Sequence, residues 1–171
     1  MASSLLFAGC SPDNDAGERQ GKGDPDRDVP ILALILDVER TSIAAYALGI
    51  SRLRGDALDL ARELADQERQ HAERLERLIK DLGRTPHPAK PAEHYQRGFP
   101  SLADELDVLT LAIDVENTAI AAYLDALPKL STGSLRATAA AIATNEAQHL
   151  SLLRDALDRP AVPDAFVTGE G

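Results

Sequence analysis

The 171-residue chain has a single cysteine, Cys10, and no tryptophan. One cysteine excludes an internal disulfide bond, and the absence of a second thiol excludes a zinc site built on paired cysteines. No run of apolar residues approaches the roughly 18 that a membrane-spanning helix requires. Basic residues are scarce, with 18 Lys and Arg against 28 Asp and Glu, and the formal net charge is −10. This acidity argues against nucleic acid and anionic membranes as electrostatic partners, because both require a basic surface.

The length of the chain predicts one domain, because 171 residues can bury a substantial core but rarely form two domains of ordinary size. Residues 11–28 are rich in Gly, Asp, Pro, Arg and Lys and are typical of a disordered spacer. Residues 29–158 carry four segments with helical periodicity, and residues 159–171 are predicted to form a short flexible tail.

Residues that start or stop helices separate these four segments. We expect helices at about 28–54, 56–82, 101–127 and 134–158, with Asp28, Asp56 and Ser101 as N-terminal caps and Gly83 as a stop. Residues 83–100 contain four prolines and two glycines without a helical period, so they are expected to form a long connection.

The chain contains the motif Glu-x-x-His twice, from Glu68 to His71 and from Glu146 to His149. Residues three apart in a helix share a face, so the Glu and the His of each motif should point toward one object. Both motifs also lie in stripes of apolar residues that recur every three or four positions, which is the pattern of a buried helix face. A solvated surface is the ordinary explanation for one such motif, but two motifs in two buried stripes indicate a shared ligand, and a metal ion is the simplest.

Two further predicted helices each carry one carboxylate, Glu39 or Glu116, on an apolar face. The segments around them are copies, because residues 36–46 and 113–123 match at an offset of 77, and the two Glu-x-x-His motifs match at an offset of 78. The chain is therefore interpreted as a duplicated helical hairpin. Burying an unpaired carboxylate costs several kcal/mol, so four buried glutamates require a common partner.

Two residues of an antiparallel hairpin lie at the same level when they are equally far from the turn. The midpoint between Glu39 and Glu68 falls at the first predicted turn, and the midpoint between Glu116 and Glu146 falls at Ser131, inside the second. Each pair of carboxylates is therefore predicted to lie side by side near the middle of its hairpin. The long connection can span a helix of about 25 residues, which would relate the hairpins by an approximate twofold axis.

The donor set suits iron or manganese, because carboxylates and imidazoles are hard to borderline ligands and no thiolate accompanies them. The charge indicates two ions, since two divalent cations would cancel the charges of four glutamates and leave a neutral cluster in the core. Tyr46 and Tyr123 each follow a glutamate by seven residues. They are expected on the same face, either as core residues or as phenols that hydrogen-bond a ligand carboxylate.

Over residues 29–158 the sequence resembles the ferritin-like superfamily, and all six ligand positions of that family are present. The resemblance implies an all-α fold, a four-helix bundle of two repeated antiparallel hairpins joined by a long crossover, with a centre of two iron or manganese ions. It implies terminal ligands Glu39 and Glu116, bridging ligands Glu68 and Glu146, and one imidazole for each ion, from His71 and His149. Nothing after Asp158 matches the fifth helix of cage-forming ferritins, and no cysteine pairs match a rubredoxin module.

The resemblance leaves two functions open. The first is an oxidoreductase whose reduced di-metal centre reacts with dioxygen or hydrogen peroxide, as a ferroxidase or a peroxidase-like enzyme. The second is a non-catalytic bundle, anchored in the cell envelope, that binds metal or has a structural role. The expected partners are metal ions and, for the enzyme, a small oxidant; a homodimer is compatible with the sequence.

Several other polar residues are expected to lie outside the centre. Asp37 and Asp114 each precede a ligand by two residues, which turns them by about 200° around the helix, so they are expected at the surface. His87 and His94 lie beside prolines in the long connection and are expected to be exposed to solvent.

Residues 1–10 end in Phe7-Ala8-Gly9-Cys10, which resembles the lipobox of a bacterial lipoprotein signal. The resemblance implies a lipid on Cys10 and a location in the cell envelope, on the outer face of the cytoplasmic membrane. The residues before the lipobox do not match a signal, because they include no Lys or Arg and their apolar run is short. Either the natural start lies upstream, or Cys10 is an unpaired thiol at the end of a cytoplasmic protein.

Overall fold

A computed structural model describes residues 23–170, so the predictions for Cys10 and for most of the spacer lie outside the described residues. The described chain is helical and contains no strand, which confirms the predicted all-α class. Its elements are, in order, α1 (Pro25–Gly49), the 3₁₀ turn η1 (Ile50–Arg52), α2 (Gly55–Asp81), the short helix α3 (Ala92–Tyr95), α4 (Glu105–Ala126), the 3₁₀ turn η2 (Leu127–Lys129) and α5 (Gly133–Ala156).

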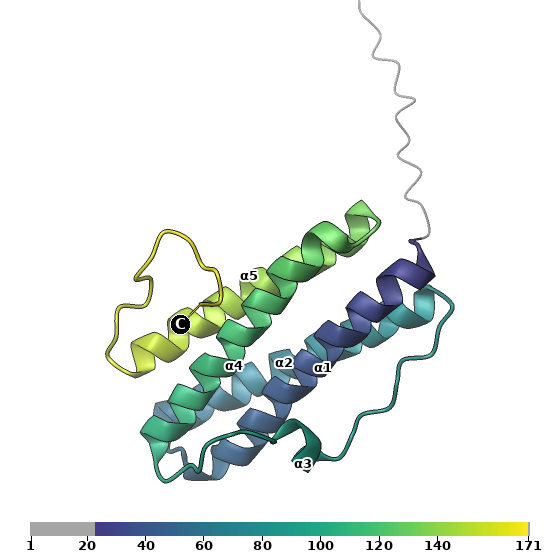
Figure 1. The fold of residues 1–171 in the computed structure, drawn as a ribbon. Helices are drawn as coiled ribbons and strands as arrows, with labels where there is room; N and C mark the ends of the chain where they lie inside the picture. The colour runs from purple at the N-terminus through teal and green to yellow at the C-terminus, as the bar shows by residue number, and fades with distance from the viewer. Residues whose placement is uncertain (1–22, 171) are drawn as a thin grey trace, which may run out of the picture.

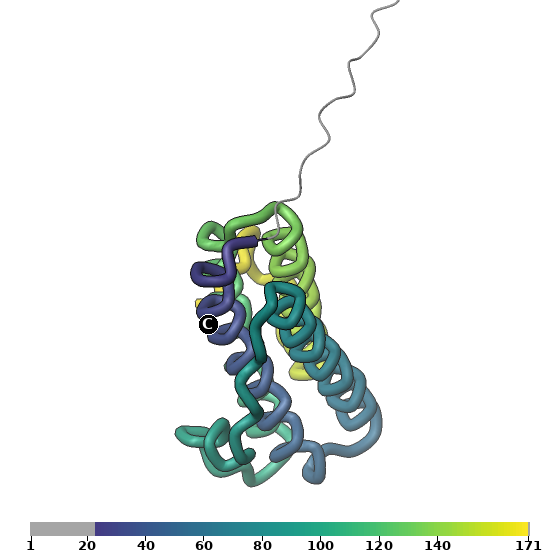
Figure 2. The backbone as a smooth tube through the Cα atoms, turned by 90° about the vertical axis from the view of Figure 1, so that its right-hand side faces the viewer, coloured from purple at the N-terminus to yellow at the C-terminus, as the bar shows by residue number. Residues whose placement is uncertain are grey.

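The four long helices form a bundle of two antiparallel hairpins, α1 with α2 and α4 with α5 (Figure 1). Helix α1 also packs along α4, whereas α2 and α5 contact each other far less than the other neighbouring pairs do. The connection between α2 and α4 returns along the bundle to its other end (Figures 1 and 2). The bundle of two hairpins joined by a long crossover is therefore the observed fold.

The first helix begins earlier than the sequence indicates, and the residue predicted as its cap has another role. Asp24 is the cap, and its carboxylate accepts hydrogen bonds from the backbone of Asp26 and Arg27. Asp28 is instead fully buried in the first turn, where it accepts a hydrogen bond of 2.8 Å from the backbone N–H of Ser131. This contact ties the start of α1 to the turn between α4 and α5, so a tertiary partner overrides the local preference for capping.

Two other predicted caps are also wrong, whereas the predicted stop is confirmed. Helix α2 begins at Gly55, before Asp56, and α4 is capped by Asp104 in place of Ser101, with the Asp104 carboxylate 3.1 Å from the backbone N–H of Asp107. Gly83 ends α2 with a φ of 74°. The N–H groups of residues 83 and 84 bond back to the carbonyls of Lys80 and Ile79, which is a Schellman ending.

The apolar core has two layers, one toward each end of the bundle. One layer includes Leu53, Leu64 and Leu153, and the other includes Leu36 and Leu75. Each of these leucines is almost completely buried, and burial of one leucine contributes about 1.5–3 kcal/mol. The residues between the layers on all four long helices include the buried glutamates, so the fold places the polar cluster at mid-height between two apolar layers.

The connection after α2 is attached to α1 by Asp37, one carboxylate oxygen of which lies 2.8 Å from His87 Nε2 while the other lies 2.8 Å from Lys90 Nζ. The hydroxyl of Tyr95 also donates to Asp37 at 3.3 Å. His87 is consequently half-buried. His94, which packs edge-on against Tyr95, is also half-buried, so the expectation that both histidines are exposed to solvent is wrong. Sequence proximity to prolines indicates a loop, but it says nothing of which helix the loop packs against.

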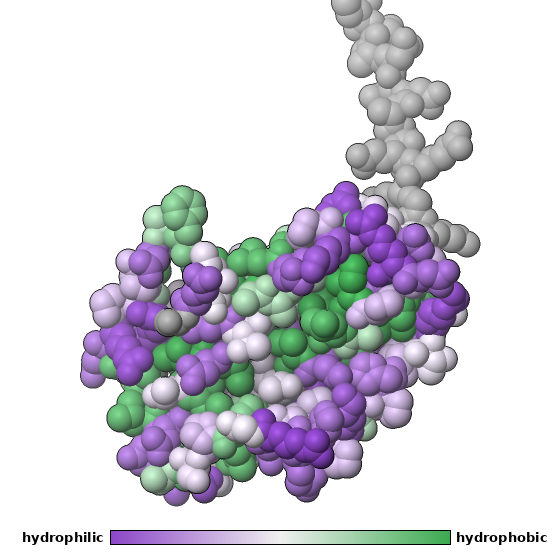
Figure 3. Space-filling view, viewed as in Figure 1, coloured by the Kyte–Doolittle hydropathy of each residue, from purple (hydrophilic) through white to green (hydrophobic). Residues whose placement is uncertain are grey.

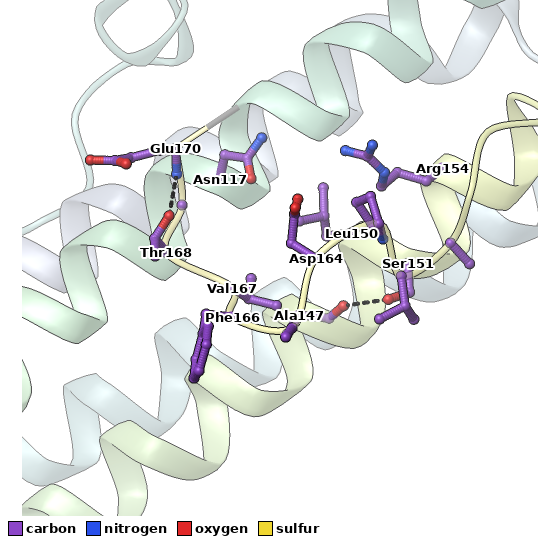
Figure 4. A pocket seen from close by; sticks show the side chains of 15 residues that line it. Asn117, Ala147, Leu150, Ser151, Arg154, Asp164, Phe166, Val167, Thr168 and Glu170 are labelled. Carbon is purple, nitrogen blue, oxygen red and sulfur yellow. Dashed lines mark hydrogen bonds between the residues drawn. The ribbon is translucent and has the colours of Figure 1, made fainter.

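After α5 the chain turns back and lies over α4 and α5 (Figures 1 and 4). At Gly169, where φ is 77°, an added Cβ would stand 2.4 Å from the backbone oxygen of Asn117 on α4, so only glycine permits this close approach. A pocket of about 330 Å³ remains between this segment and residues such as Leu150 and Arg154 of α5 (Figure 4). The flexibility expected for residues 159–171 stays a prediction.

Apolar side chains reach the surface on the face that α1 and α4 present in Figure 3. Leu34 of α1 and Leu124 of α4 are exposed to 60% and 43%. Such a face is compatible with the homodimer expected from the sequence, which stays a prediction. Within the described residues, no helix combines the length and the apolarity needed to cross a membrane.

Candidate metal centre

The four long helices bring six side chains together at the middle of the bundle. They are Glu39 of α1, Glu68 and His71 of α2, Glu116 of α4, and Glu146 and His149 of α5. Their donor atoms form two groups, each with all ligand atoms within 4.8 Å of one another: Glu39, Glu68, His71 and Glu146 in one, and Glu68, Glu116, Glu146 and His149 in the other. Glu68 and Glu146 belong to both groups, so their positions are those of bridging ligands.

Burial of these groups is nearly complete. Each of the four glutamates is 0% exposed, the side chain of His149 is 1% exposed and that of His71 is 12% exposed. The carboxylate oxygens of Glu68 and Glu146 and the Nδ1 atoms of both histidines lack hydrogen-bond partners. Buried polar atoms without partners are costly, and these converge on a common space. The residues present therefore fit two divalent cations, for which they supply oxygen and imidazole donors.

Each histidine is oriented by an amide from the other hairpin. His71 Nε2 lies 2.9 Å from Asn145 Oδ1, and His149 Nε2 lies 3.0 Å from Gln67 Oε1. An amide oxygen only accepts, so Nε2 carries the proton in both rings and Nδ1 faces the glutamates. His71 Nδ1 is 2.9 Å from a Glu146 oxygen but is not aligned as a donor to it. This geometry points both Nδ1 atoms at the space where a cation would bind.

Each tyrosine hydrogen-bonds a ligand carboxylate of the other hairpin. The Tyr46 hydroxyl donates to Glu116, and the Tyr123 hydroxyl donates to Glu39. Burial raises the pKa of both phenols well above the usual value, and the neighbouring carboxylates raise it further. Both phenols therefore stay protonated and remain donors. Both tyrosines therefore contact a carboxylate of the centre, and their rings are also buried members of the apolar core.

The protein groups share protons when no metal is bound. Burial raises the pKa of Glu116 to about 8, and it raises the pKa of Glu68 as well. Burial would also raise the pKa of Glu146, but the facing imidazoles of His149 and His71 outweigh burial and lower it. Burial disfavours protonated imidazoles, yet the facing carboxylates raise the pKa of His71 to about 9 and that of His149 to about 12. Binding of a metal ion here would therefore release protons from Nδ1 and from the carboxylates.

Sequence reasoning missed Gln67 and Asn145. A signal for them was available, because each immediately precedes the Glu of a Glu-x-x-His motif and both are amides at matching positions of the repeat. Their function became visible only when the two hairpins were placed against each other, since each amide contacts the histidine of the opposite hairpin.

Comparisons with known proteins agree with this architecture. The model of the ferritin-like domain family matches residues 27–159. A solved structure, that of the conserved hypothetical protein rv2844 from Mycobacterium tuberculosis, is similar with a TM-score of 0.68, covering 78% of this chain and 98% of that chain at 18% identity. At this identity the similarity concerns the fold alone. The search of curated proteins gave no match. The family match covers most of the chain, and the protein belongs to the ferritin-like domain family.

Proposed function

We propose that this protein holds two first-row metal ions, iron or manganese, and acts as an oxidoreductase on dioxygen or hydrogen peroxide, in a ferroxidase or peroxidase-like reaction. The observation that carries the proposal is the pair of ligand groups that share Glu68 and Glu146. A single ion would leave half of these buried donors without a partner. Two divalent ions would balance the charges of the four glutamates, so that the core would hold no net charge.

Iron or manganese bound at these residues would supply the valence change and the Lewis acidity that reactions with oxidants require. The remaining contribution comes from the chain itself. Tyr46 and Tyr123 hold the carboxylates of Glu116 and Glu39 by hydrogen bonds, which limits their rotation. The two apolar layers limit the access of water to the centre from the two ends of the bundle. Such a dry and rigid site favours reaction of a bound small oxidant over side reactions with solvent.

Elemental analysis of protein loaded with iron or manganese tests the proposal, together with the absorption spectrum after aerobic addition of ferrous iron. We expect about two ions per chain and a ferric absorption band that grows faster than in a protein-free control. A metal content near zero would refute the di-metal centre. Two bound ions without accelerated oxidation or peroxide consumption would refute the enzyme and support the non-catalytic metal-binding bundle.

We also propose that the protein is held at the cell envelope by a lipid on Cys10, which lies outside the described residues. The support is the sequence Phe7-Ala8-Gly9-Cys10 followed by a polar segment. A single acyl chain anchors only marginally, so several chains would be required for stable attachment. Expression of the natural gene with Cys10→Ser, followed by separation of membrane and soluble fractions, tests this location. Identical partitioning of the two proteins would refute it and favour a cytoplasmic location.

A further inference from the structure

The weak contact between α2 and α5 leaves a groove that leads to one side of the metal centre. At the His71 end this groove has a volume of about 610 Å³. Its lining includes Gln70, His71, Arg74 and Arg77 of α2, together with Thr138 and Ala141 of α5. We call this space the basic groove. The small residues of α5 keep it wide, and the 12% exposure of the His71 side chain is consistent with its opening there.

The charge of the basic groove is opposite to that of the whole protein. The chain has a net charge of −10, yet the groove is lined by two arginines and by no Asp or Glu. Arg74 donates only a weak hydrogen bond, of 3.4 Å, to the Thr138 hydroxyl, and no carboxylate of the described residues lies within ion-pair distance of it. Arg77 contacts Glu73 at 3.5 Å, with both side chains more than half exposed. Such exposed pairs are weak, so both guanidinium groups can engage an additional anion.

The other end of the same helix pair has none of these features, although the repeat makes the two ends equivalent. At the offset of 78, Leu152 and Asp155 correspond to Arg74 and Arg77. The cavity at that end, of about 510 Å³, is lined by three carboxylates, from Asp56, Glu105 and Asp155, against one arginine. His149 does not line this cavity, and its side chain is only 1% exposed. The basic groove is therefore a property of one end of the bundle and not a consequence of the repeated fold.

We propose that the basic groove binds a small dianion, of the phosphate or dicarboxylate class, between Arg74 and Arg77. These arginines are three residues apart on one helix, so their side chains are neighbours and can converge on one ligand. A guanidinium group presents two parallel N–H donors that match the oxygens of a carboxylate or a phosphate. The volume of the groove is sufficient for a small organic anion.

The basic groove borders the candidate metal centre, because His71 belongs to both. An anion held between the two arginines lies on the side of His71, whereas the arginines repel free cations from this entrance. This relation to the reaction rests on the proposed function, but the anion site itself is formed by the protein and does not depend on metal.

Titration calorimetry of the metal-free, full-length chain tests the anion site, with inorganic phosphate and succinate as separate probes. We expect one of them to bind at about one per chain, with an affinity that falls as salt rises. Arg74→Gln and Arg77→Gln should each weaken binding by about 10-fold or more, the usual effect of losing a charge-assisted hydrogen bond. Arg62→Gln is the matched control, because Arg62 is an exposed arginine of α2 that does not line the groove.

The choice of probe and the control distinguish the outcomes. Binding of phosphate alone identifies a phosphate-type ligand, and binding of succinate alone identifies a dicarboxylate. The proposal is overturned if neither anion binds at millimolar concentration, or if Arg62→Gln weakens binding as much as Arg74→Gln does. Thermal melting of each variant shows whether it is folded. Because the titration uses metal-free protein, its failure leaves the metal content unaffected, and a failure of metal binding leaves the titration interpretable.

Discussion

The two hairpins make the same contacts toward the centre and different contacts away from it. Glu39 and Glu116, and likewise Tyr46 and Tyr123, occupy matching positions and make matching contacts across the bundle. Outside the centre the correspondence ends, because Asp37 holds the connection while its counterpart Asp114 is exposed. A buried cluster of charges tolerates few alternatives, since each donor needs its partner. Surface positions have no such requirement, so the hairpins can differ there.

The same contrast applies along the seam between α2 and α5. One end has a groove lined by arginines beside His71, whereas the cavity at the other end is lined mainly by carboxylates, and the side chain of His149 is more deeply buried than that of His71. The symmetric interior therefore has asymmetric surroundings. The two groups of buried side chains have equivalent residues and different access to solvent, and the experiments below test the equivalence and the difference separately.

The largest expected effect comes from changing the two glutamates that belong to both groups of donor atoms. The double variant Glu68→Gln/Glu146→Gln should reduce metal content from about two ions per chain to near zero, because both ions lose a ligand from each shared residue. Glu39→Gln should affect one position more than the other. Elemental analysis after gel filtration measures both, and Glu63→Gln, at an exposed position of α2, is the control. Retention of two tightly bound ions by the double variant would contradict the assignment.

Removal of metal should make stability sensitive to pH. The folded protein raises the pKa of His71 from 6.5 to about 9 and that of Glu116 from 4.5 to about 8. Both groups bind a proton more tightly in the folded protein than in the unfolded chain. Their contribution to stability is therefore complete below their pKa in the unfolded chain and is lost as the pH rises through about 8 to 9. The lowered pKa of Glu146 acts oppositely, and its contribution is lost on acidification.

The measurement is a set of thermal melts at pH 6.5 and pH 9, with and without metal. The metal-free protein should melt at a lower temperature at pH 9 than at pH 6.5. Metal should raise the melting temperature at both values, because it binds only the folded state. An unchanged melting temperature after chelation would show that the six residues do not form a buried metal cluster.

A smaller effect tests the equivalence of the two histidines. Gln67→Ala and Asn145→Ala each remove the amide that fixes one Nε2–H group, and loss of such an outer hydrogen bond commonly weakens metal affinity by about 10-fold to 100-fold. If the centre is symmetric, the two variants should weaken different ions by similar factors. Competition titrations with a chromophoric chelator measure the affinities, and Gln70→Ala serves as a control. No change in either variant would show that the amides do not orient the ligands.

The smallest effect concerns the difference between Asp37 and Asp114. Asp37→Asn should destabilise the protein by about 1 kcal/mol, because it weakens contacts with His87 and Lys90 that are partly screened by solvent. The pKa of Asp37 is lowered, since hydrogen bonds from Lys90 and His87 outweigh the opposing effect of burial. Asp114→Asn should change stability by less than about 0.5 kcal/mol. Urea unfolding measures both, and equal effects would contradict the role of Asp37 in holding the connection.

Most of the fold could be predicted because its signals are local. The spacing of three residues in Glu-x-x-His places both side chains on one helix face wherever the helix lies, and the apolar stripe around them shows which face is buried. The distance of each glutamate from the turn determined its level in the hairpin. The signal for the end of α2 was also local, because Gly83 adopts a positive φ that suits a helix terminus.

The errors concern residues whose partners are distant in the chain. Asp28 has the side chain of a cap, but Ser131, more than 100 positions away, is its partner. His87 has the neighbours of a loop residue, but Asp37 holds it against α1. Neither contact can be predicted from the local sequence pattern, because a hydrogen bond between distant segments depends on how the helices pack.

The sequence by itself determined the four helices, the six residues of the candidate metal centre and the duplication, because helical periodicity and the cost of burying charge act on each segment separately. Tertiary structure alone decided how the two copies complete each other. The tyrosine of one hairpin holds the glutamate of the other, and the amide of one hairpin orients the histidine of the other. It also decided that one end of the seam between α2 and α5 is open and basic, since the width of a groove depends on side chains from two helices at once.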